Sequence, residues 1–127
     1  MPRTPVPTKA ELAILQVLWE SGLRTVREIH NALKDQRGTG YSTTLKMIQV
    51  MTDKGLVRRD DSQRPQRYRA ALPEEATQLQ MVDDLIQRGF GGSALKLVLR
   101  AVSARRVSAE ELADIRSLID QAKRGAQ

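Results

Sequence analysis

The sequence has no cysteine, and aromatic residues make up only 3% of its 127 residues. The absence of cysteine excludes disulfides, thiolate metal sites and cysteine nucleophiles. With so few rings, the core must be built from aliphatic residues, which favours helices. His30 is the single histidine and is interpreted as a solvated side chain, and no phosphate loop, nucleophile elbow or metal-ligand spacing is present. The sequence therefore predicts a protein that is not an enzyme and has no cofactor or metal.

Long apolar segments are also lacking. Residues 1–11 contain no apolar core of the kind that a secretory signal needs. The apolar runs elsewhere are far shorter than the roughly 20 residues that cross a bilayer. The sequence therefore predicts a cytoplasmic protein that does not insert into a membrane.

Positive charge is in excess, and it is distributed unevenly along the chain. The net charge is +6, with 13 Lys/Arg against 7 Asp/Glu in residues 1–72 and 8 of each in residues 73–127. A basic half joined to a neutral half indicates one module that binds a polyanion and another that binds protein. A chance imbalance among solvated side chains is the alternative interpretation.

Two capping boxes predict the first two helices. In a capping box, a hydroxyl and a carboxylate three residues later accept hydrogen bonds from each other's backbone amides. The boxes are Thr8 to Glu11, before a helix over about 9–20, and Thr25 to Glu28, before a helix over about 26–36. Apolar residues recur at helical spacing in both segments, which predicts one buried face on each helix.

A third helix and a hairpin complete the first half. The helix is predicted to be capped by Ser42 or Thr43 and to end at Gly55. Short extended runs then lie on either side of a polar loop over about 61–65, which predicts a hairpin. Three helices followed by a hairpin is the element order of a winged helix. The sequence therefore predicts a mainly α fold with a winged helix-turn-helix DNA-binding domain over residues 1–72.

The second half contains only helical patterns. Helices are predicted after Pro73, over the apolar segment 94–102, and after a capping box from Ser108 to Glu111. About 55 residues of short helices bury too little surface to be stable alone. Residues 73–127 are therefore predicted to be a three-helix dimerisation domain; an intramolecular cap on the first domain is the alternative. The predicted dimer contacts are Leu95, Val98, Leu99, Val102, Leu112, Ile115 and Ile119.

The outward face of the third helix is the candidate DNA-reading surface. In a helix-turn-helix this helix enters the major groove. The predicted buried stripe is Thr44, Met47, Ile48 and Met51, which leaves Ser42, Thr43, Lys46, Gln49 and Val50 facing outward. Hydroxyls at a helix start suit a phosphate, lysine suits guanine and glutamine suits adenine. The alternative is that Thr43 only caps the helix and Lys46 only increases solubility.

The hairpin offers a second, basic surface. On an extended strand Tyr68 would point inward while Arg67 and Arg69 point outward. Further arginines in the hairpin would suit phosphates or a minor groove, although basic hairpins also occur on solvated surfaces. The complete predicted DNA-binding set is Thr25, Arg27, Ser42, Thr43, Lys46, Gln49, Arg58, Arg64 and Arg67.

Several segments together resemble the BlaI/MecI/CopY family of penicillinase-type repressors. They are "TKAELAILQVLWE", "TVREIHNAL", "YSTTLKMIQVMTDKGLV", "RYRA" and "GGSALKLVLRAV...SAEELADIRSLI", and they extend over about residues 8–122. The resemblance implies a winged-helix domain, a helical dimerisation domain, and repression by binding two-fold symmetric operators. It places Ser42, Thr43, Lys46 and Gln49 at groove-facing positions. Val50 departs from the family, in which many members carry arginine there, so the operator sequence does not carry over.

The resemblance leaves the inducing signal open. Copper-responsive members of the family carry a cysteine-rich metal site, which this chain lacks. Beta-lactam-responsive members are cleaved by a membrane sensor-protease, commonly between Asn and Phe. The resemblance suggests such a protease as an antirepressor partner and places the corresponding bond between Arg100 and Ala101. Neither residue matches that pair, which argues against cleavage at this bond.

These inferences predict a homodimeric transcriptional repressor. It would bind a palindromic operator in double-stranded DNA through residues 42–54, with backbone contacts from the wing. The alternative is a winged-helix adaptor that docks an acidic protein partner and does not bind DNA.

Overall fold

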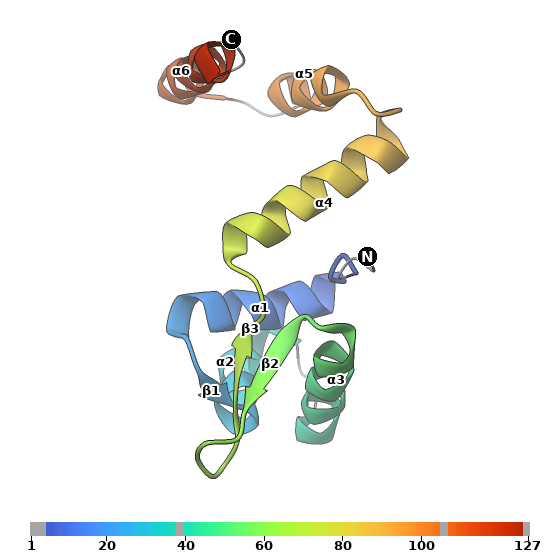
Figure 1. The fold of residues 1–127 in the computed structure, drawn as a ribbon, viewed down its shortest axis with the longest axis vertical. Coiled ribbons are helices and arrows are strands. Elements are labelled where there is room, and N and C mark those ends of the chain that lie inside the picture. The colour runs from blue at the N-terminus through green and yellow to red at the C-terminus, as the bar shows by residue number, and fades with distance from the viewer. Residues whose placement is uncertain (1–4, 38–39, 105–106, 126–127) are drawn as a thin grey trace. The chain divides into compact units, whose positions relative to one another are not determined.

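The computed structural model describes residues 5–37, 40–104 and 107–125, and these residues fall into two compact units divided between Asp84 and Leu85. The described elements are α1 (Lys9–Ser21), β1 (Arg24–Thr25), α2 (Val26–Arg37), α3 (Tyr41–Lys54), β2 (Val57–Asp60), β3 (Arg67–Ala70), α4 (Glu74–Gly89), α5 (Ala94–Ala104) and α6 (Ala109–Gly125) (Figure 1). The predicted mainly α fold with a winged helix is confirmed. None of the helices within the described ranges is both long and apolar enough to span a membrane.

Both predicted capping boxes of the first unit are present. The Thr8 amide donates to Glu11 Oε1 at 3.0 Å, and the Glu11 amide donates to Thr8 Oγ1 at 3.2 Å. The same exchange joins Thr25 and Glu28, at 2.9 and 3.1 Å. Each box satisfies two amides that the first helical turn leaves without a partner. The starts of α1 and α2 are therefore confirmed as predicted.

The start of α3 differs from the prediction. The N-cap is Gly40, in extended backbone, and the helix begins at Tyr41, so Ser42 and Thr43 lie within its first turn. The prediction that one of these hydroxyls caps the helix was wrong. Glycine is itself an acceptable N-cap, and contacts of the Tyr41 ring with α2 favour a helix that already includes this residue. The predicted end is confirmed, with Gly55 in the left-handed region at φ 82°.

The hairpin contains one strand more than predicted. β2 and β3 pair antiparallel around the polar loop, as expected. β1 adds to the other edge of β3, with Arg24 opposite Tyr68 and Thr25 opposite Arg67, so the sheet order is β1-β3-β2. A strand of two residues is too short to produce a period in the sequence. It is defined only by its partner, more than 40 residues later in the chain.

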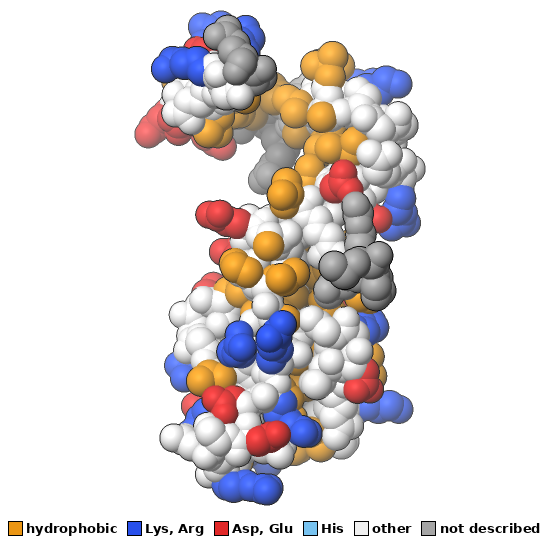
Figure 2. Space-filling view, viewed as in Figure 1, with side chains coloured by type: hydrophobic (Ala, Val, Ile, Leu, Met, Phe, Trp, Pro, Cys, Tyr) orange, Lys and Arg blue, Asp and Glu red, His pale blue; other side chains and the backbone are white. Residues whose placement is uncertain are grey.

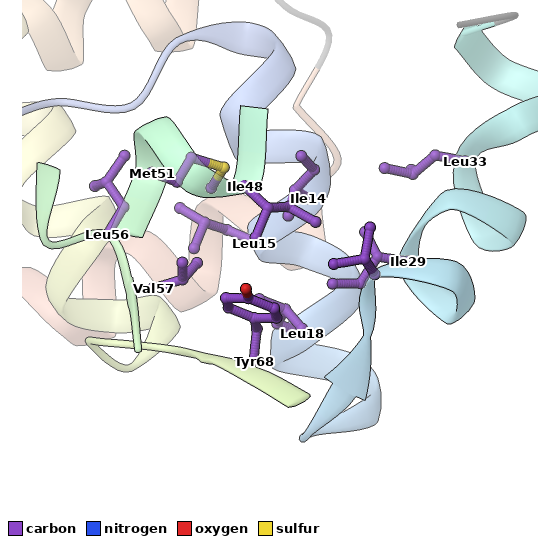
Figure 3. Packing of buried hydrophobic residues seen from close by; sticks show 11 residues of the cluster. Ile14, Leu15, Leu18, Ile29, Leu33, Ile48, Met51, Leu56, Val57 and Tyr68 are labelled. Atoms are coloured by element: carbon purple, nitrogen blue, oxygen red, sulfur yellow. The ribbon is translucent and has the colours of Figure 1, made fainter. Parts of the chain in front are cut away.

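The core of the first unit lies between the three helices and the sheet (Figure 3). Ile48 and Met51 of α3 are completely buried, and Tyr68 points inward from β3, as predicted. Trp19 packs at the edge of this core, and its Nε1 donates to the Leu72 carbonyl at 2.9 Å. This bond holds the residues that precede α4 against α1. The assignment of separate roles to residues 1–72 and 73–127 stays a prediction.

A buried acid on α1 forms an ion pair with a lysine on α3. Glu11 is 4% exposed, and Lys54 Nζ lies 2.8 Å from its Oε2. Burial raises the pKa of Glu11, but hydrogen bonds from Lys54 and the Thr8 amide outweigh this effect, so the pKa lies below its ordinary value of 4.5. The ion pair joins the start of α1 to the last turn of α3.

This ion pair predicts an acid-dependent loss of stability. Above 4.5, the ordinary pKa, Glu11 is ionised in both states, and below it the unfolded chain takes up the proton first because the folded-state pKa is lower. Protonation therefore favours unfolding. Urea denaturation of the protein and of Glu11→Gln, at pH values from about 6 to about 3, should show the wild-type advantage shrinking as the pH falls. An advantage that stays constant over this range would contradict the lowered pKa.

The helices α5 and α6 leave most of their apolar side chains uncovered in the single chain. Ser108 directly precedes α6, and its Oγ accepts a hydrogen bond from the Glu111 amide at 3.0 Å, as the predicted capping box requires. Five of the seven predicted dimer contacts are exposed, and the two others, Val102 and Ile115, are half-buried. Figure 2 shows hydrophobic side chains emerging along α4 and α5. Exposing several neighbouring apolar side chains to water is unfavourable unless another surface covers them.

Candidate nucleic-acid interface

The outward face of α3 carries a strip of polar side chains. Ser42, Thr43, Lys46 and Gln49 are all exposed, and Ile48 on the opposite side is buried in the core. The predicted stripe holds α3 against the rest of the unit, with Met47 half-buried at its margin. A helix fixed on one side and polar on the other can enter a groove without losing its own packing.

The first turn of α3 has amides suited to an anion. Because the N-cap is glycine, no side chain at that position accepts a hydrogen bond from the amides of Ser42 and Thr43. The helix dipole adds partial positive charge at the same end. The two exposed hydroxyls lie beside these amides, so a phosphate oxygen would find several donors at the start of α3.

Side chains of α2 hold this end of α3 in place. The Arg27 guanidinium carbon lies 4.0 Å from the centroid of the Tyr41 ring. His30 meets the same ring edge-on at 5.7 Å, and its Nδ1 lies 3.1 Å from Thr44 Oγ1. His30 was interpreted as a solvated side chain, but it is half-buried, because α3 lies beside α2 and brings Thr44 and Tyr41 against it. Stacking on Tyr41 restricts Arg27 while leaving it exposed, next to the first turn of α3.

The wing consists of β2, β3 and the loop between them, and its arginines differ in their neighbours. Arg58 on β2 is directly opposite Arg69 on β3, and both are exposed. Like charges in opposite positions repel, and a bound anion would relieve this repulsion. By contrast, Arg59 forms an ion pair with Asp61 at 2.9 Å, and Arg67 Nη1 donates to Gln63 Oε1 at 2.6 Å. Lys and Arg side chains lie side by side over the strands in Figure 2.

Two carboxylates reduce the positive charge around Arg67. The Thr25 amide lowers the pKa of Glu28, and hydrogen bonds from Ser62 lower the pKa of Asp60. Both acids also interact electrostatically with Arg67, and Asp60 interacts with Arg69 as well. Arg67, which was placed in the predicted DNA-binding set, therefore lies in a partly neutralised environment. Arg64 is exposed in the loop between β2 and β3 and extends the basic surface.

Thr25 differs from the other predicted DNA-binding residues. Its side chain is 8% exposed, and its hydroxyl already accepts the Glu28 amide. It also pairs with Arg67 through β1, so the structure gives it a structural position at the start of α2. It borders a hollow of about 220 Å³ between the starts of α2 and α3 and the wing. That hollow is lined by Thr25, Val26, Arg27, Tyr41, Leu45, Pro65, Gln66 and Tyr68.

The described residues hold no group of three His, Cys, Asp or Glu side chains that could bind a metal ion. The candidate surface is therefore one of hydroxyls, amides, lysine, glutamine and arginine. Residues 7–121 match the family described as Penicillinase repressor. The chain belongs to the penicillinase repressor family.

Individual relatives agree with this assignment. The Transcriptional regulator BlaI of Mycobacterium tuberculosis, in strains CDC 1551 / Oshkosh and ATCC 25618 / H37Rv, is 30% identical over 117 residues, which cover 91% of this chain and 83% of the relative. The solution structure of the DNA binding domain of the repressor BlaI aligns with a TM-score of 0.51 over 58% of this chain and 90% of that chain. At 22% identity this structure supports the fold. The chain is therefore a BlaI-like transcriptional repressor with a winged helix-turn-helix DNA-binding domain.

The repressor's predicted cleavage bond lies within a helix. Arg100 and Ala101 are both exposed on α5. Cleavage at this bond would require a protease to act on a helical segment. Cleavage, and the sensor-protease as a partner, stay predictions.

Proposed function

We propose that the repressor acts as a homodimer that binds a palindromic operator, with one α3 in each of two major grooves. The observation that carries this proposal is the strip of Ser42, Thr43, Lys46 and Gln49, exposed opposite the buried Ile48. Two-fold symmetry of the protein implies two-fold symmetry of the DNA site. The half-sites are therefore expected about 10 base pairs apart, or at a multiple of that distance.

The dimer is supported by the uncovered apolar faces of α5 and α6. Leu95 and Leu99 lie one turn apart on α5, and Leu112 and Ile119 lie two turns apart on α6, all exposed in the single chain. A second copy offers matching faces, and burying apolar surface is the main favourable term in association. The neutral charge balance of residues 73–127 removes the repulsion that two basic halves would have.

DNA binding divides into phosphate contacts and base contacts. The first turn of α3, Arg27 on its Tyr41 support, and the exposed arginines of the wing are suited to phosphates. Lys46 and Gln49 lie further along the outward face, where side chains of their length reach guanine and adenine edges. The phosphate contacts orient the domain, and the base contacts select the operator.

Lys46→Ala should separate a base contact from a phosphate contact. If Lys46 reads a base, we expect binding to the operator to weaken by about 1–3 kcal/mol, with little change on random DNA. Fluorescence anisotropy with both duplexes measures the two affinities. Lys9→Ala, an exposed lysine at the start of α1, is the matched control and should leave both affinities unchanged. An equal loss on both duplexes for Lys46→Ala would assign the lysine to a phosphate.

A further inference from the structure

One apolar side chain interrupts the polar strip of α3. Val50 is 40% exposed, although the buried stripe on the other side of the helix includes Ile48 at 0%. At 3.6 residues per turn, Lys46 and Val50 each lie about 160° from Ile48 around the helix axis. They therefore flank the outermost line of α3, the part that would enter a groove most deeply.

The position of Val50 on α3 is more informative than its exposure. Single exposed apolar side chains are common on protein surfaces. A β-branched residue on an exposed helix face, however, is a poorer helix former than alanine, and at 40% exposed Val50 is only partly covered by the rest of the chain. Among base edges in the major groove, the 5-methyl group of thymine is the apolar feature that such a side chain can contact.

We infer that Val50 reads a thymine 5-methyl group in each operator half-site. The inference rests on the proposed function, because it requires α3 to lie in the major groove. The strip then combines hydrogen bonds from Lys46 and Gln49 with one apolar contact.

The geometry also places the thymine. Val50 follows Lys46 by four residues, which corresponds to about 6 Å along the helix axis. Base pairs are stacked about 3.4 Å apart. A helix inclined to the DNA axis advances along it by at most about 6 Å over these four residues, so the thymine is expected within about two base pairs of the base that Lys46 contacts.

Removing single methyl groups from the DNA tests this inference. Operator duplexes are first selected from a random-sequence library with the full-length protein, and each thymine of one half-site is then replaced in turn by deoxyuridine. We expect one position at which the wild type loses affinity about threefold to fivefold, the effect of burying one methyl group. Val50→Ala should bind the thymine and deoxyuridine duplexes equally at that position.

A matched variant distinguishes this contact from a general effect of surface apolarity. Leu23 is 38% exposed, similar to Val50, but lies outside α3. The Leu23→Ala variant should therefore keep the wild-type sensitivity to deoxyuridine. Thermal melting verifies that both variants are folded. The inference is overturned if the wild type is insensitive at every thymine, or if Val50→Ala keeps the same loss. Failure to select any duplex would instead contradict the proposed function.

Discussion

Ile119→Asp should make the repressor monomeric at micromolar concentration and weaken operator binding by about 10²–10⁴-fold. Ile119 is exposed on α6 in the single chain and belongs to the predicted dimer seam with Leu112 and Ile115. A carboxylate there would be buried without a partner in the dimer, which is strongly unfavourable. Without the dimer, the second half-site no longer adds to the affinity of the first. Sedimentation velocity measures the assembly, and anisotropy on the palindromic duplex measures the binding.

A charge on the other side of the same helix provides the control. Ser117 is exposed on α6, about 160° from Ile119 around the axis. Ser117→Asp should therefore remain dimeric and bind DNA as the wild type does. Binding of single half-site duplexes by Ile119→Asp should also remain unchanged, because the winged helix is untouched. An Ile119→Asp protein that still sediments as a dimer would refute the proposed seam.

Salt should weaken operator binding steeply. If a dimer neutralises 6–10 phosphates, raising the salt concentration from 50 to 200 mM should lower the affinity by about 10³–10⁵-fold. The exposed arginines of the wing, together with Arg27 and Lys46, provide enough cations in two copies for contacts of this order. The physical reason is the release of counterions condensed on the DNA. Anisotropy titrations over a series of salt concentrations give the slope.

Arg64→Gln should reduce the salt dependence of operator binding. Each phosphate contact contributes about 0.9 to the logarithmic slope, so loss of one contact per subunit should reduce it by about 2. Lys9→Gln, at the start of α1, should leave the slope unchanged. An affinity independent of salt would exclude phosphate neutralisation. Tight binding of an acidic protein with no binding of any duplex would favour the adaptor interpretation.

The predicted elements and the outward face of α3 could be obtained from sequence because their determinants are local. Capping boxes such as Thr8 to Glu11 connect residues three apart, and the buried stripe of α3 repeats at helical spacing. The turn at Gly55 likewise depends on a single left-handed residue. Each of these signals lies within about one helical turn and can therefore be recognised without knowledge of tertiary contacts.

The features that the sequence did not reveal depend on partners distant in the chain. β1 forms because it pairs with β3. Arg27 is restrained because its guanidinium group stacks on the Tyr41 ring of α3. The sequence around His30 is typical of a surface residue, but α3 brings Thr44 Oγ1 within 3.1 Å of its Nδ1. No local spacing marks any of these pairs.

By itself, the sequence determined the order and type of the helices and of the hairpin, the basic first half and the outward-facing residues of α3, because composition, charge and helical period are properties of the chain. Only the tertiary structure decided how those residues are supported and which charges remain available. It placed the start of α3 at Tyr41, paired Arg59 with Asp61, and set Arg58 opposite Arg69. Such distinctions arise when distant segments pack together, since an ion pair or a cross-strand repulsion needs two side chains within a few ångströms.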